Sequence, residues 1–395
     1  MSEHPNSLEY MEKKYMKEMR KLGDIVELID ERNKSLESSE VLGISIDKEF
    51  MPSVANTIGT DLSNYKLLRM NTFACNPMHV GRDERLPVSL YKKNVPAIVS
   101  PAYFMFRVKD ENKVLPDFLM LIFKRENFDR NCWFRTDGSV RGGITWNDIC
   151  EIELPVPDLK EQEKIVNTYN AITKRIQLKQ KINDNLEKMA ECLFDKIWES
   201  DECIEVELSE LADLTSSKRV FFDEYVPEGI PFYRGGEITE KRQGFPISNP
   251  LYITEESYNE KIEKYGVPNA GDILITAVGT IGNSYMVTEN DKFYFKDGNL
   301  IWFRNFKNNS NYIIYDFLNS KQFKKKIEQI SIGSTQTALT ISGLSKIKIK
   351  IPNSINYQRY IEQSKVIQKS IQQNNTELEN LYYLKNILIS QISKR

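Results

Sequence analysis

The sequence predicts an α+β fold in which two mixed α/β domains are separated by two long helices that pair as an antiparallel coiled coil. Two patterns predict this fold: a heptad repeat of apolar residues occurs twice, and the chain resembles itself at a constant offset. A chain of 395 residues is also too long for one ordinary core. We expect a first domain at 1–156, a central helix at 157–200, a second domain at 201–354 and a C-terminal helix at 355–395.

The central helix is the clearest element of the sequence. No Pro or Gly occurs from Asp158 to Ser200, and the polar positions are rich in Lys, Glu, Gln and Asn, which favours one long helix. A seam this narrow packs against one partner helix rather than into a broad core. At alternating spacings of four and three, with one Lys and one Asn near the centre, the seam consists of Ile165, Tyr169, Ile172, Ile176, Lys179, Asn183, Leu186, Ala190, Leu193 and Ile197.

The partner helix lies in the same chain. The same rhythm recurs in Tyr360, Ser364, Ile367, Ile371, Asn374, Leu378, Leu381, Lys385, Leu388 and Ile392. If the helices run antiparallel with level ends, Asn183 faces Asn374, whereas a parallel alignment places Asn183 opposite Leu378. Because a buried polar seam residue costs stability and serves to fix register, we predict the antiparallel pair. In the alternative, both amides lie in solvent at a frayed seam.

An internal repeat relates the two halves of the chain. The segment GSVRGGITWNDICEIELPVP (138–157) aligns with GSTQTALTISGLSKIKIKIP (333–352), so that Thr145 coincides with Thr340. The segment KLGDIVELI (21–29) likewise resembles ELSELADLT (207–215). The chain therefore reads as a tandem duplication of a globular region followed by a helix.

Short apolar runs bounded by Gly, Pro and Asn predict strands within both globular regions. In the first region these runs are VLGISI, KLLRMNTFAC, AIVSPAYFMFRV and EIELPV, and helices are expected at 8–22 and at about 116–129, opening at Pro116. In the second region, strands are expected at 230–234, 272–278, 284–288, 299–304 and 346–351, with a helix at 311–329. Neither region has the long βαβ alternation of a doubly wound sheet.

The most distinctive local string is GDILITAVGTIGN (271–283), a strand that leads into a turn at Gly279 and Gly282. Glycine is needed where φ is positive or where backbones approach closely. A phosphate-binding loop is one interpretation, but the chain contains no GxxxxGK[ST] and no GK dipeptide. A strand followed by a tight structural turn is the favoured interpretation.

Several classes of function lack their usual residues. The chain has two histidines, His4 and His79, and its five cysteines form no CxxC pair, which argues against a His-based triad or a zinc site. No [ND]PP[YF] tetrapeptide, FxGxG or GxGxxG motif supports a cofactor-binding methyltransferase or dehydrogenase domain. The cysteines read as reduced thiols, no apolar run approaches a membrane span, and the charged N-terminus lacks a signal peptide's apolar core. We therefore expect a cytoplasmic protein without catalytic residues, metal or cofactor.

Nucleic-acid binding remains compatible with the composition. A net charge of −2 argues against a uniformly basic surface, but local basic clusters are present. The repeated Gly-Ser loops carry Arg141 in one copy and Gln336 with Thr337 in the other, and such side chains read base edges in DNA. They could equally be ordinary turn residues.

At this point the chain resembles a known family, the specificity subunit of type I restriction–modification enzymes. The resemblance rests on LPVPDLKEQEKIV (154–166), KINDNLEKMAECLFDKIW (181–198), GDILITAVGTIGN, and the order of two globular regions alternating with two helices. It spans nearly the whole chain. The segment IPNSINYQRYI (351–361) departs from the pattern because it lacks the second Pro and the Glu before Gln358, and the first region has only NYKLLRMNTFACN (64–76) as a weak counterpart of GDILITAVGTIGN.

The resemblance implies that the globular regions are target-recognition domains, each of which reads one half of a bipartite double-stranded DNA site. The helix pair would set a fixed gap near one helical turn of DNA. Two modification subunits would bind the chain and supply S-adenosylmethionine and adenine methylation, and restriction subunits would supply ATP- and Mg-dependent translocation and cleavage. The chain itself would be non-catalytic.

Recognition domains of this family diverge widely, so the DNA-contacting residues cannot be transferred from relatives. From residue type and position we select Arg69, Asn71, Arg82, Arg85, Arg135, Arg141, Lys218, Arg219, Arg234, Lys241, Arg242, Gln336 and Thr337, each with a solvated or structural role as the alternative. Three other functions stay open: a specificity subunit of another restriction class, a nuclease or fused restriction–modification enzyme, and a coiled-coil scaffold that binds only protein.

Overall fold

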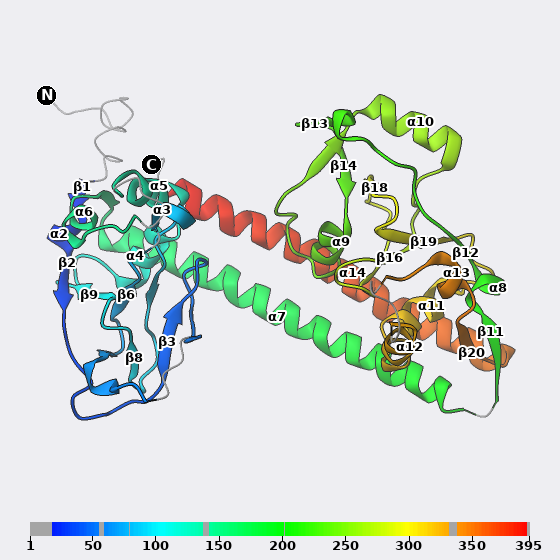
Figure 1. The fold of residues 1–395 in the computed structure, drawn as a ribbon, viewed down its shortest axis with the longest axis horizontal. Helices are drawn as coiled ribbons and strands as arrows, with labels where there is room; N and C mark the ends of the chain where they lie inside the picture. The colour runs from blue at the N-terminus through cyan, green and yellow to red at the C-terminus, as the bar shows by residue number, and fades with distance from the viewer. Residues whose placement is uncertain are drawn as a thin grey trace, which may run out of the picture. The chain divides into compact units, whose positions relative to one another are not determined.

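A computed structural model describes residues 18–54, 59–78, 80–136, 142–200, 202–331 and 338–392. It divides into two compact units, Met1–Thr173 with Leu384–Arg395, and Lys174–Tyr383 (Figure 1). Each unit holds one globular domain and parts of both long helices. The limits of these units lie inside the two long helices, at 173/174 and 383/384. They therefore do not test the predicted domain boundaries at 156, 200 and 354, which stay predictions.

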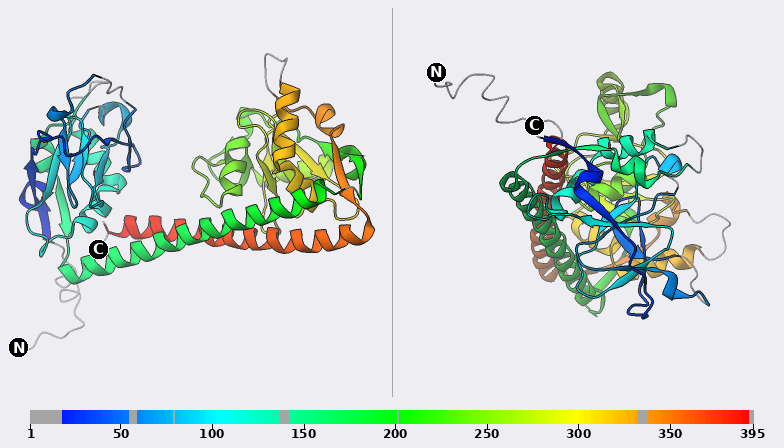
Figure 2. Two further views of the ribbon diagram at one scale, coloured as in Figure 1. Left: turned by 90° about the horizontal axis from the view of Figure 1, so that it is seen from below. Right: turned by 90° about the vertical axis from the view of Figure 1, so that its left-hand side faces the viewer.

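The two predicted long helices are present as α7 (Leu159–Trp198) and α14 (Ser354–Gln391). Within the second unit they lie side by side and antiparallel, since contacts progress from Gln180 with Tyr382 to Ala190 with Ile367 (Figure 2). No predicted seam residue is exposed on either helix. The antiparallel coiled coil is therefore confirmed.

A polar layer crosses this coiled coil where the register places the two asparagines opposite each other. Asn374 Nδ2 donates to Asn183 Oδ1 at 2.8 Å, and Asn183 Nδ2 donates to Asn375 Oδ1 at 2.7 Å. Lys179 Nζ donates to Asn374 Oδ1 at 2.8 Å and pairs with Glu377 at 2.8 Å. The layer thus satisfies polar side chains in the seam through their own mutual contacts.

The first globular domain contains two four-stranded sheets and a covering layer of helices. The inner sheet has the order β2 (Val26–Ile29), β9 (Phe104–Val108), β6 (Phe73–Cys75) and β7 (Val88–Leu90), and the outer sheet has the order β4 (Phe50–Pro52), β3 (Val41–Ile44), β8 (Ala97–Val99) and β5 (Lys66–Leu68). A separate two-stranded ladder joins β1 (Glu18–Lys21) to β10 (Glu153–Val156). The helices are α2 (Leu22–Ile25), α3 (Val80–Asp83), α4 (Pro116–Phe123), α5 (Glu126–Phe134) and α6 (Trp146–Cys150), with a 3-10 turn η1 (Leu62–Asn64).

The second globular domain repeats this plan. Its inner sheet has the order β12 (Asp213–Thr215), β19 (Leu300–Arg304), β16 (Ile273–Thr276) and β17 (Ser284–Met286). Its outer sheet has the order β13 (Tyr225–Val226), β15 (Leu251–Ile253), β14 (Ile230–Tyr233) and β18 (Tyr294–Phe295). A two-stranded ladder joins β11 (Cys203–Glu207) to β20 (Lys348–Pro352). The helices are α8 (Leu208–Leu211), α9 (Gly235–Arg242), α10 (Glu255–Tyr265), α11 (Asn311–Leu318), α12 (Lys321–Ser331) and α13 (Ile341–Ser345), with η2 (Phe222–Glu224) as a 3-10 turn.

The inner sheets read as continuous apolar runs because both of their faces are buried. In β16, Ile273 and Ile275 join the core under α11 and α12, whereas Leu274 joins the core between the two sheets. In the first domain Phe73 packs toward α4 and Ala74 toward the outer sheet. Side chains of a strand alternate between its faces, so a strand buried on both sides needs no polar alternation.

The duplication predicted from sequence is confirmed in three dimensions. Thr145 and Thr340 each accept a hydrogen bond as the N-cap of a short helix, α6 and α13. In both outer sheets one strand, β3 or β14, has an antiparallel neighbour on one side and a parallel neighbour on the other. The sheets differ in the place of the fourth strand. It pairs with the parallel neighbour β8 in the first domain and with the antiparallel neighbour β15 in the second.

Three predictions of helices need correction. Residues 8–17 of the predicted helix at 8–22 lie outside the described residues, and Glu18–Lys21 forms strand β1 because it pairs with β10. The predicted helix at 116–129 is two helices, α4 and α5, and the one at 311–329 is likewise divided into α11 and α12. The helices α9 and α10 were not predicted.

Candidate nucleic-acid interface

Four connections meet at one end of the inner sheet in the second domain, and we call them the loop edge of that domain (residues 216–219, 234–236, 277–283 and 296–299). Ala277 N donates to Asn299 O at 2.8 Å, and Gly298 N donates to the Ser216 hydroxyl at 3.2 Å. A Cβ placed on Gly235 would lie 3.3 Å from the Thr276 side chain. Connections that gather at the end of a rigid sheet are suited to carry binding residues.

Glycines leave the backbone open along this edge. A Cβ added at Gly236, Gly279 or Gly298 would meet no atom within 4 Å. Gly279 and Gly298 adopt φ of 78° and 71°, the left-handed region that favours glycine. The predicted strand and tight turn of GDILITAVGTIGN are thus confirmed, and open space lies beside Gly279 in the turn.

The first domain presents corresponding connections at the same end of its inner sheet, and we call them the loop edge of that domain (residues 76–78, 80–85 and 142–144). Ile144 N donates to Pro77 O at 3.1 Å, just as Leu339 N donates to Ala277 O at 2.9 Å in the second domain. Gly81 N donates to Gly142 O at 2.9 Å. The segment around β6, predicted as the weak counterpart of GDILITAVGTIGN, therefore occupies the same place in its domain.

The predicted DNA-contact residues of the first domain fall into two groups. Arg82 and Arg85 follow the loop after β6, and both are exposed, with Arg82 paired to Asp83 at 2.7 Å and Arg85 to Asp47 at 3.6 Å. Arg135 follows α5 and donates to the Asn131 carbonyl at 3.2 Å.

Arg69 and Asn71 instead lie at the start of β6, the opposite end of the strand. Arg69 pairs with Glu31 and Glu37, and hydrogen bonding to Glu31 is the main reason that its pKa is raised. Asn71 has φ of 61° in a tight turn. The structure therefore separates these two from Arg82 and Arg85.

In the second domain, Lys218, Arg219 and Arg234 belong to the loop edge. Lys218 lies 5.2 Å from the centre of the Tyr265 ring, and Arg219 Nε lies 3.3 Å from Asp297. Arg234 pairs with Glu237, a largely buried carboxylate at the start of α9. The side chain of Arg219 is 69% exposed and that of Arg234 is 40% exposed, so Arg219 is the more available of these two arginines.

The structure engages Lys241 and Arg242 in ion pairs inside the second unit, and their role as DNA contacts stays a prediction. Lys241 is mostly buried and pairs with Asp291 at 3.0 Å and with Glu379 of α14 at 3.5 Å. Burial opposes the charge of Lys241, but these carboxylates still raise its pKa. Arg242 lies 3.6 Å from Glu187 of α7. Both residues hold the second domain against the helices rather than facing outward.

Three candidates, Arg141, Gln336 and Thr337, lie outside the described residues. Their described neighbours Gly142 and Leu339 bond to the loop after β6 and β16, respectively.

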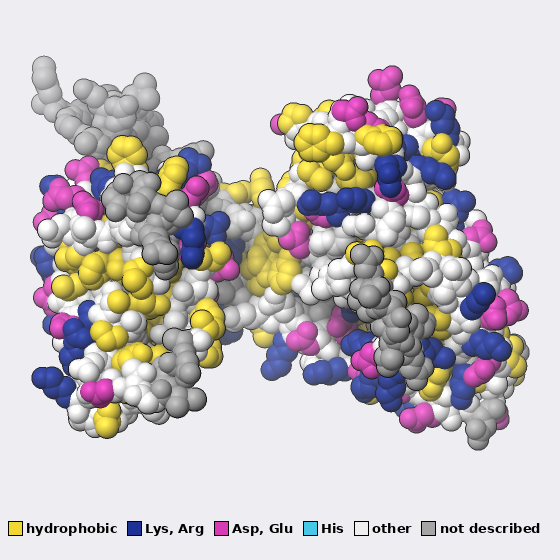
Figure 3. Space-filling model, viewed as in Figure 1, with side chains coloured by type: hydrophobic (Ala, Val, Ile, Leu, Met, Phe, Trp, Pro, Cys, Tyr) yellow, Lys and Arg dark blue, Asp and Glu magenta, His cyan; other side chains and the backbone are white. Residues whose placement is uncertain are grey.

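Exposed aromatic residues near the basic side chains were missed by the sequence reasoning. Phe221 is 60% exposed and Phe222 is 89% exposed, and both follow Lys218 and Arg219 directly. Figure 3 shows hydrophobic side chains beside Lys and Arg on this unit. The signal was present in the sequence as Lys-Arg-Val-Phe-Phe, since aromatic rings interleaved with cations suit nucleic-acid bases.

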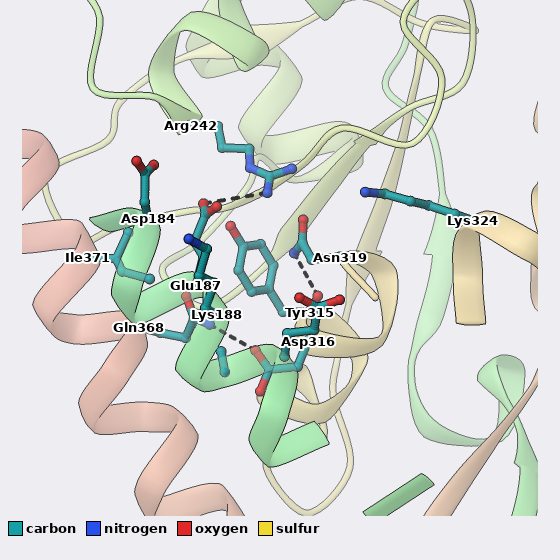
Figure 4. Close-up of a pocket in the computed structure, with 12 residues that line it drawn as sticks. Asp184, Glu187, Lys188, Arg242, Tyr315, Asp316, Asn319, Lys324, Gln368 and Ile371 are labelled. Atoms are coloured by element: carbon teal, nitrogen blue, oxygen red, sulfur yellow. Dashed lines mark hydrogen bonds and ion pairs between the residues drawn. The ribbon is translucent and has the colours of Figure 1, made fainter. Parts of the chain in front are cut away.

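A pocket of about 310 Å³ lies where α11 and α12 meet α7 and α14 in the second unit (Figure 4). Asp316 is buried beside it and accepts hydrogen bonds from Tyr360 at 2.6 Å, Ser364 at 2.6 Å and Gln368 at 2.8 Å. Burial raises the pKa of Asp316 to about 6, although the three hydrogen bonds oppose this shift. The arrangement fastens the second domain to α14.

Among the described residues, no three His, Cys, Asp or Glu side chains gather in a way that could hold a metal ion. Over the same residues, no helix combines the length and the apolar character needed to cross a bilayer.

Comparison with known proteins connects this architecture to one family. A family model described as "Type I restriction modification DNA specificity domain" matches residues 16–188 and again residues 201–381. A type I restriction enzyme specificity subunit of Haemophilus influenzae is 30% identical over 226 residues, which cover 54% of this chain and 55% of that protein. The chain therefore spans about half the length of this relative.

Two further proteins are similar over more of the chain. The MjaVIII specificity subunit of Methanocaldococcus jannaschii is 25% identical over 306 residues, covering 70% of this chain and 69% of that protein. The crystal structure of a type I restriction–modification S subunit from M. genitalium has a TM-score of 0.60 at 18% identity and covers 99% of this chain and 98% of that one, so it shares the fold. With two matched copies of its domain, the chain belongs to the type I restriction–modification DNA specificity family.

Proposed function

We propose that this chain is the DNA-recognition subunit of a type I restriction–modification complex. Each globular domain reads one half of a bipartite site in double-stranded DNA, and the paired helices fix the gap between the halves. The observation that carries this proposal is the duplicated loop edge, because two domains with one architecture present equivalent connections at the same end of their inner sheets.

The loop edges supply the two kinds of contact that DNA recognition needs. Exposed cations such as Arg82, Arg85, Lys218 and Arg219 suit phosphates, whose contacts position a protein on the duplex. The repeated Gly-Ser segments of the sequence, which lie outside the described residues, contain Arg141, Gln336 and Thr337, whose side chains suit base edges.

The proposal makes this chain a non-catalytic partner of other subunits. Modification subunits would bring S-adenosylmethionine and methylate a flipped adenine, and restriction subunits would bring ATP- and Mg-dependent cleavage. A stripe of exposed apolar side chains on α7, Leu178, Ile182 and Met189, has the spacing of a second helix-packing seam and supports helix-mediated assembly. The same fold would serve a specificity subunit of another restriction class, with different partners.

Two matched double variants test the half-site assignment. Lys218→Ala with Arg219→Ala changes the second domain, and Arg82→Ala with Arg85→Ala changes the first. Each pair should weaken recognition of one half-site and leave the other intact, because each loop edge serves its own half. The readout is methylation of DNA sites that carry substitutions in either half, using this chain assembled with its modification subunits.

Equal loss at both half-sites from either pair would contradict the proposal. It would indicate generic electrostatics or misfolding instead. Thermal unfolding of all variants separates these two explanations.

A further inference from the structure

The first unit carries a broad groove between its globular domain and the adjoining ends of the long helices. Residues 46–49, 83–85, 124–127, 129–131, 133 and 134 of the globular domain line the groove, together with Tyr169, Lys385 and Ile389 of the long helices. Trp133 is 45% exposed and Phe134 is 85% exposed within it. The groove therefore combines charged walls with projecting apolar side chains.

Arg125 is buried in this groove without a partner. Its side chain lies at the junction of α4 and α5, the residue is 8% exposed, and its Nε and Nη1 atoms have no hydrogen-bond partner. The other arginines and the lysines that the globular domain contributes pair with carboxylates: Lys48 with Asp129 at 2.6 Å, Lys124 with Glu49 at 2.9 Å, Arg85 with Asp47 at 3.6 Å and Arg130 with Glu126 at 2.5 Å. A buried guanidinium with unpartnered Nε and Nη1 atoms is costly, so its retention calls for an anion that none of the described residues provides.

The internal duplication supplies a control for this interpretation. The junction of α4 and α5 (Lys124–Arg125) corresponds to that of α11 and α12 (Asn319–Ser320). The helix α11 begins 195 residues after α4, at 311 and 116, and α12 begins 195 residues after α5, at 321 and 126. Ser320 is satisfied locally, because its hydroxyl donates to Phe317 O at 2.6 Å and accepts from Phe323 N at 3.2 Å. Arg125 instead gives α5 no side-chain cap. The second unit thus shows that the fold needs no arginine at this junction.

We propose that the groove of the first unit binds a segment of a protein partner whose carboxylate pairs with Arg125 while its apolar side chains pack on Trp133 and Phe134. Arginine and carboxylate form bidentate charge-assisted hydrogen bonds, which fit a planar guanidinium at the base of a groove. The groove walls hold seven carboxylates and six cations, so they do not attract a phosphate backbone. Because Ser320 replaces Arg125 in the second unit, this contact belongs to the first half alone.

The identity of the partner rests on the proposed function, which supplies modification and restriction subunits as candidates. The anion site itself does not depend on that function. Arg125→Ser is the sharpest variant, because it recreates the junction that the second unit already has. Arg130→Ser removes an exposed cation from the same groove and serves as the matched control.

The first measurement uses the full chain alone, with acetate as the probe for a carboxylate. Acetate at constant ionic strength should raise the melting temperature of the wild-type chain relative to chloride, because the anion binds the folded state. The rise should persist in Arg130→Ser and disappear in Arg125→Ser. An equal response of wild type and Arg125→Ser would overturn the anion site.

The second measurement uses the modification and restriction subunits with the full chain. Arg125→Ser should weaken association with one of these subunits by about thirtyfold or more, the range for removing one partner of a buried charge pair, while Arg130→Ser changes it little. Unchanged association with every subunit would overturn the assignment to a protein partner, as would loss of DNA affinity in place of subunit affinity. A wild-type chain that binds neither subunits nor DNA would contradict the proposed function instead, and the acetate response would still decide the anion site.

Discussion

Asp316 illustrates how much one side chain contributes to this molecule. It is a buried carboxylate whose three contacts, Tyr360, Ser364 and Gln368, are neutral donors on a single face of α14. Hydrogen bonds compensate part of the cost of burying the charge, and the remainder appears as a pKa raised to about 6 from an ordinary 3.8. The residue therefore links attachment of the second domain to pH.

Replacing Asp316 with Asn should remove a defined pH dependence of stability. Because the folded pKa lies above the unfolded one, the folded state binds the proton more tightly. The stabilisation is complete below pH 3.8 and is lost as the pH rises through 6. Between pH 7 and pH 5 the contribution to the unfolding free energy is about 1 kcal/mol in favour of the lower pH.

Denaturant unfolding of wild type and Asp316→Asn at several pH values in this range measures the contribution by difference. Other carboxylates titrate in both proteins and cancel in the comparison. Parallel curves for the two proteins would show that Asp316 does not titrate in this window.

Lys241 and Arg219 should behave in opposite ways although both are cations of the second domain. Lys241→Ala leaves Asp291, whose side chain is 4% exposed, without its ion pair, and breaking a buried pair costs about 3 kcal/mol. Arg219→Ala should change stability little, because its exposed pair with Asp297 is screened by water. Thermal unfolding measures the first effect, and DNA affinity of the assembled complex measures the second.

The expected pattern is loss of stability for Lys241→Ala and loss of DNA affinity for Arg219→Ala. The reverse pattern would show that Lys241 faces DNA. Residue type and local sequence could not tell that Lys241 is engaged in an ion-pair cluster whereas Arg219 is exposed. The difference depends on contacts such as that between Lys241 and Glu379, which lies far away in the chain.

At the scale of elements, the polar layer of the coiled coil is the feature that sequence reasoning placed best. Alternating spacings of four and three identified the seams, and counting layers from the ends brought Asn183 opposite Asn374, where a hydrogen bond joins them. Helix periodicity sufficed because a two-helix seam depends on few neighbours.

Exchange of both asparagines for leucine should raise the thermal stability of the helix pair and relax its register. Leucine buries apolar surface without polar cost, but it no longer distinguishes one alignment from another. Asn374→Leu alone should destabilise, since Lys179 and Asn183 then lose their partner. Thermal unfolding with light scattering would detect both the stability change and any new oligomer.

A double variant that remains a monomer with one register would contradict the role of this layer in fixing register. A single variant as stable as wild type would contradict its contribution to stability. Variants at the neighbouring exposed Leu178 provide the matched control on the same helix.

Short elements were predicted less well than long ones, for physical reasons. The break between α4 and α5 lies at Lys124–Arg125, two good helix formers, so local propensity gives no signal for it. Strand β1 was taken as part of an amphipathic helix because its identity comes from pairing with β10, more than 130 positions along the sequence. The inner strands were found because burial on both faces leaves a continuous apolar run.

At the scale of the whole molecule, methylation mapping tests the two-domain reading of DNA. If the proposed function holds, expression of this chain with a modification subunit in a methylation-free host should give a split motif with one fixed gap, because the helix pair would then set the separation of the half-sites. A continuous motif, or an intact complex without modification, would mean that the duplicated domains are not two DNA readers.

Because of the duplication, the order of domains and helices in the whole molecule was the feature most predictable from sequence. The DNA sequence that the domains would recognise was not predictable in this way. The offset that aligns Thr145 with Thr340 also aligns the helix junctions at 124–125 and 319–320. In the proposed function, base recognition would depend on the conformation of loops such as 277–283, and the pattern of apolar residues in the neighbouring strands does not specify that conformation.

The small ladders β1·β10 and β11·β20 have a consequence for inheritance. In the second domain, Cys203 lies opposite Pro352 and Glu207 opposite Lys348, so the chain leaves the central helix and returns to the next one at neighbouring positions about 5 Å apart. Everything between the two ends can be exchanged as a cassette without moving either helix. If each domain reads one half-site as proposed, a recombination event at these boundaries would change one half-site in a single step and leave the sequence of both helices unchanged.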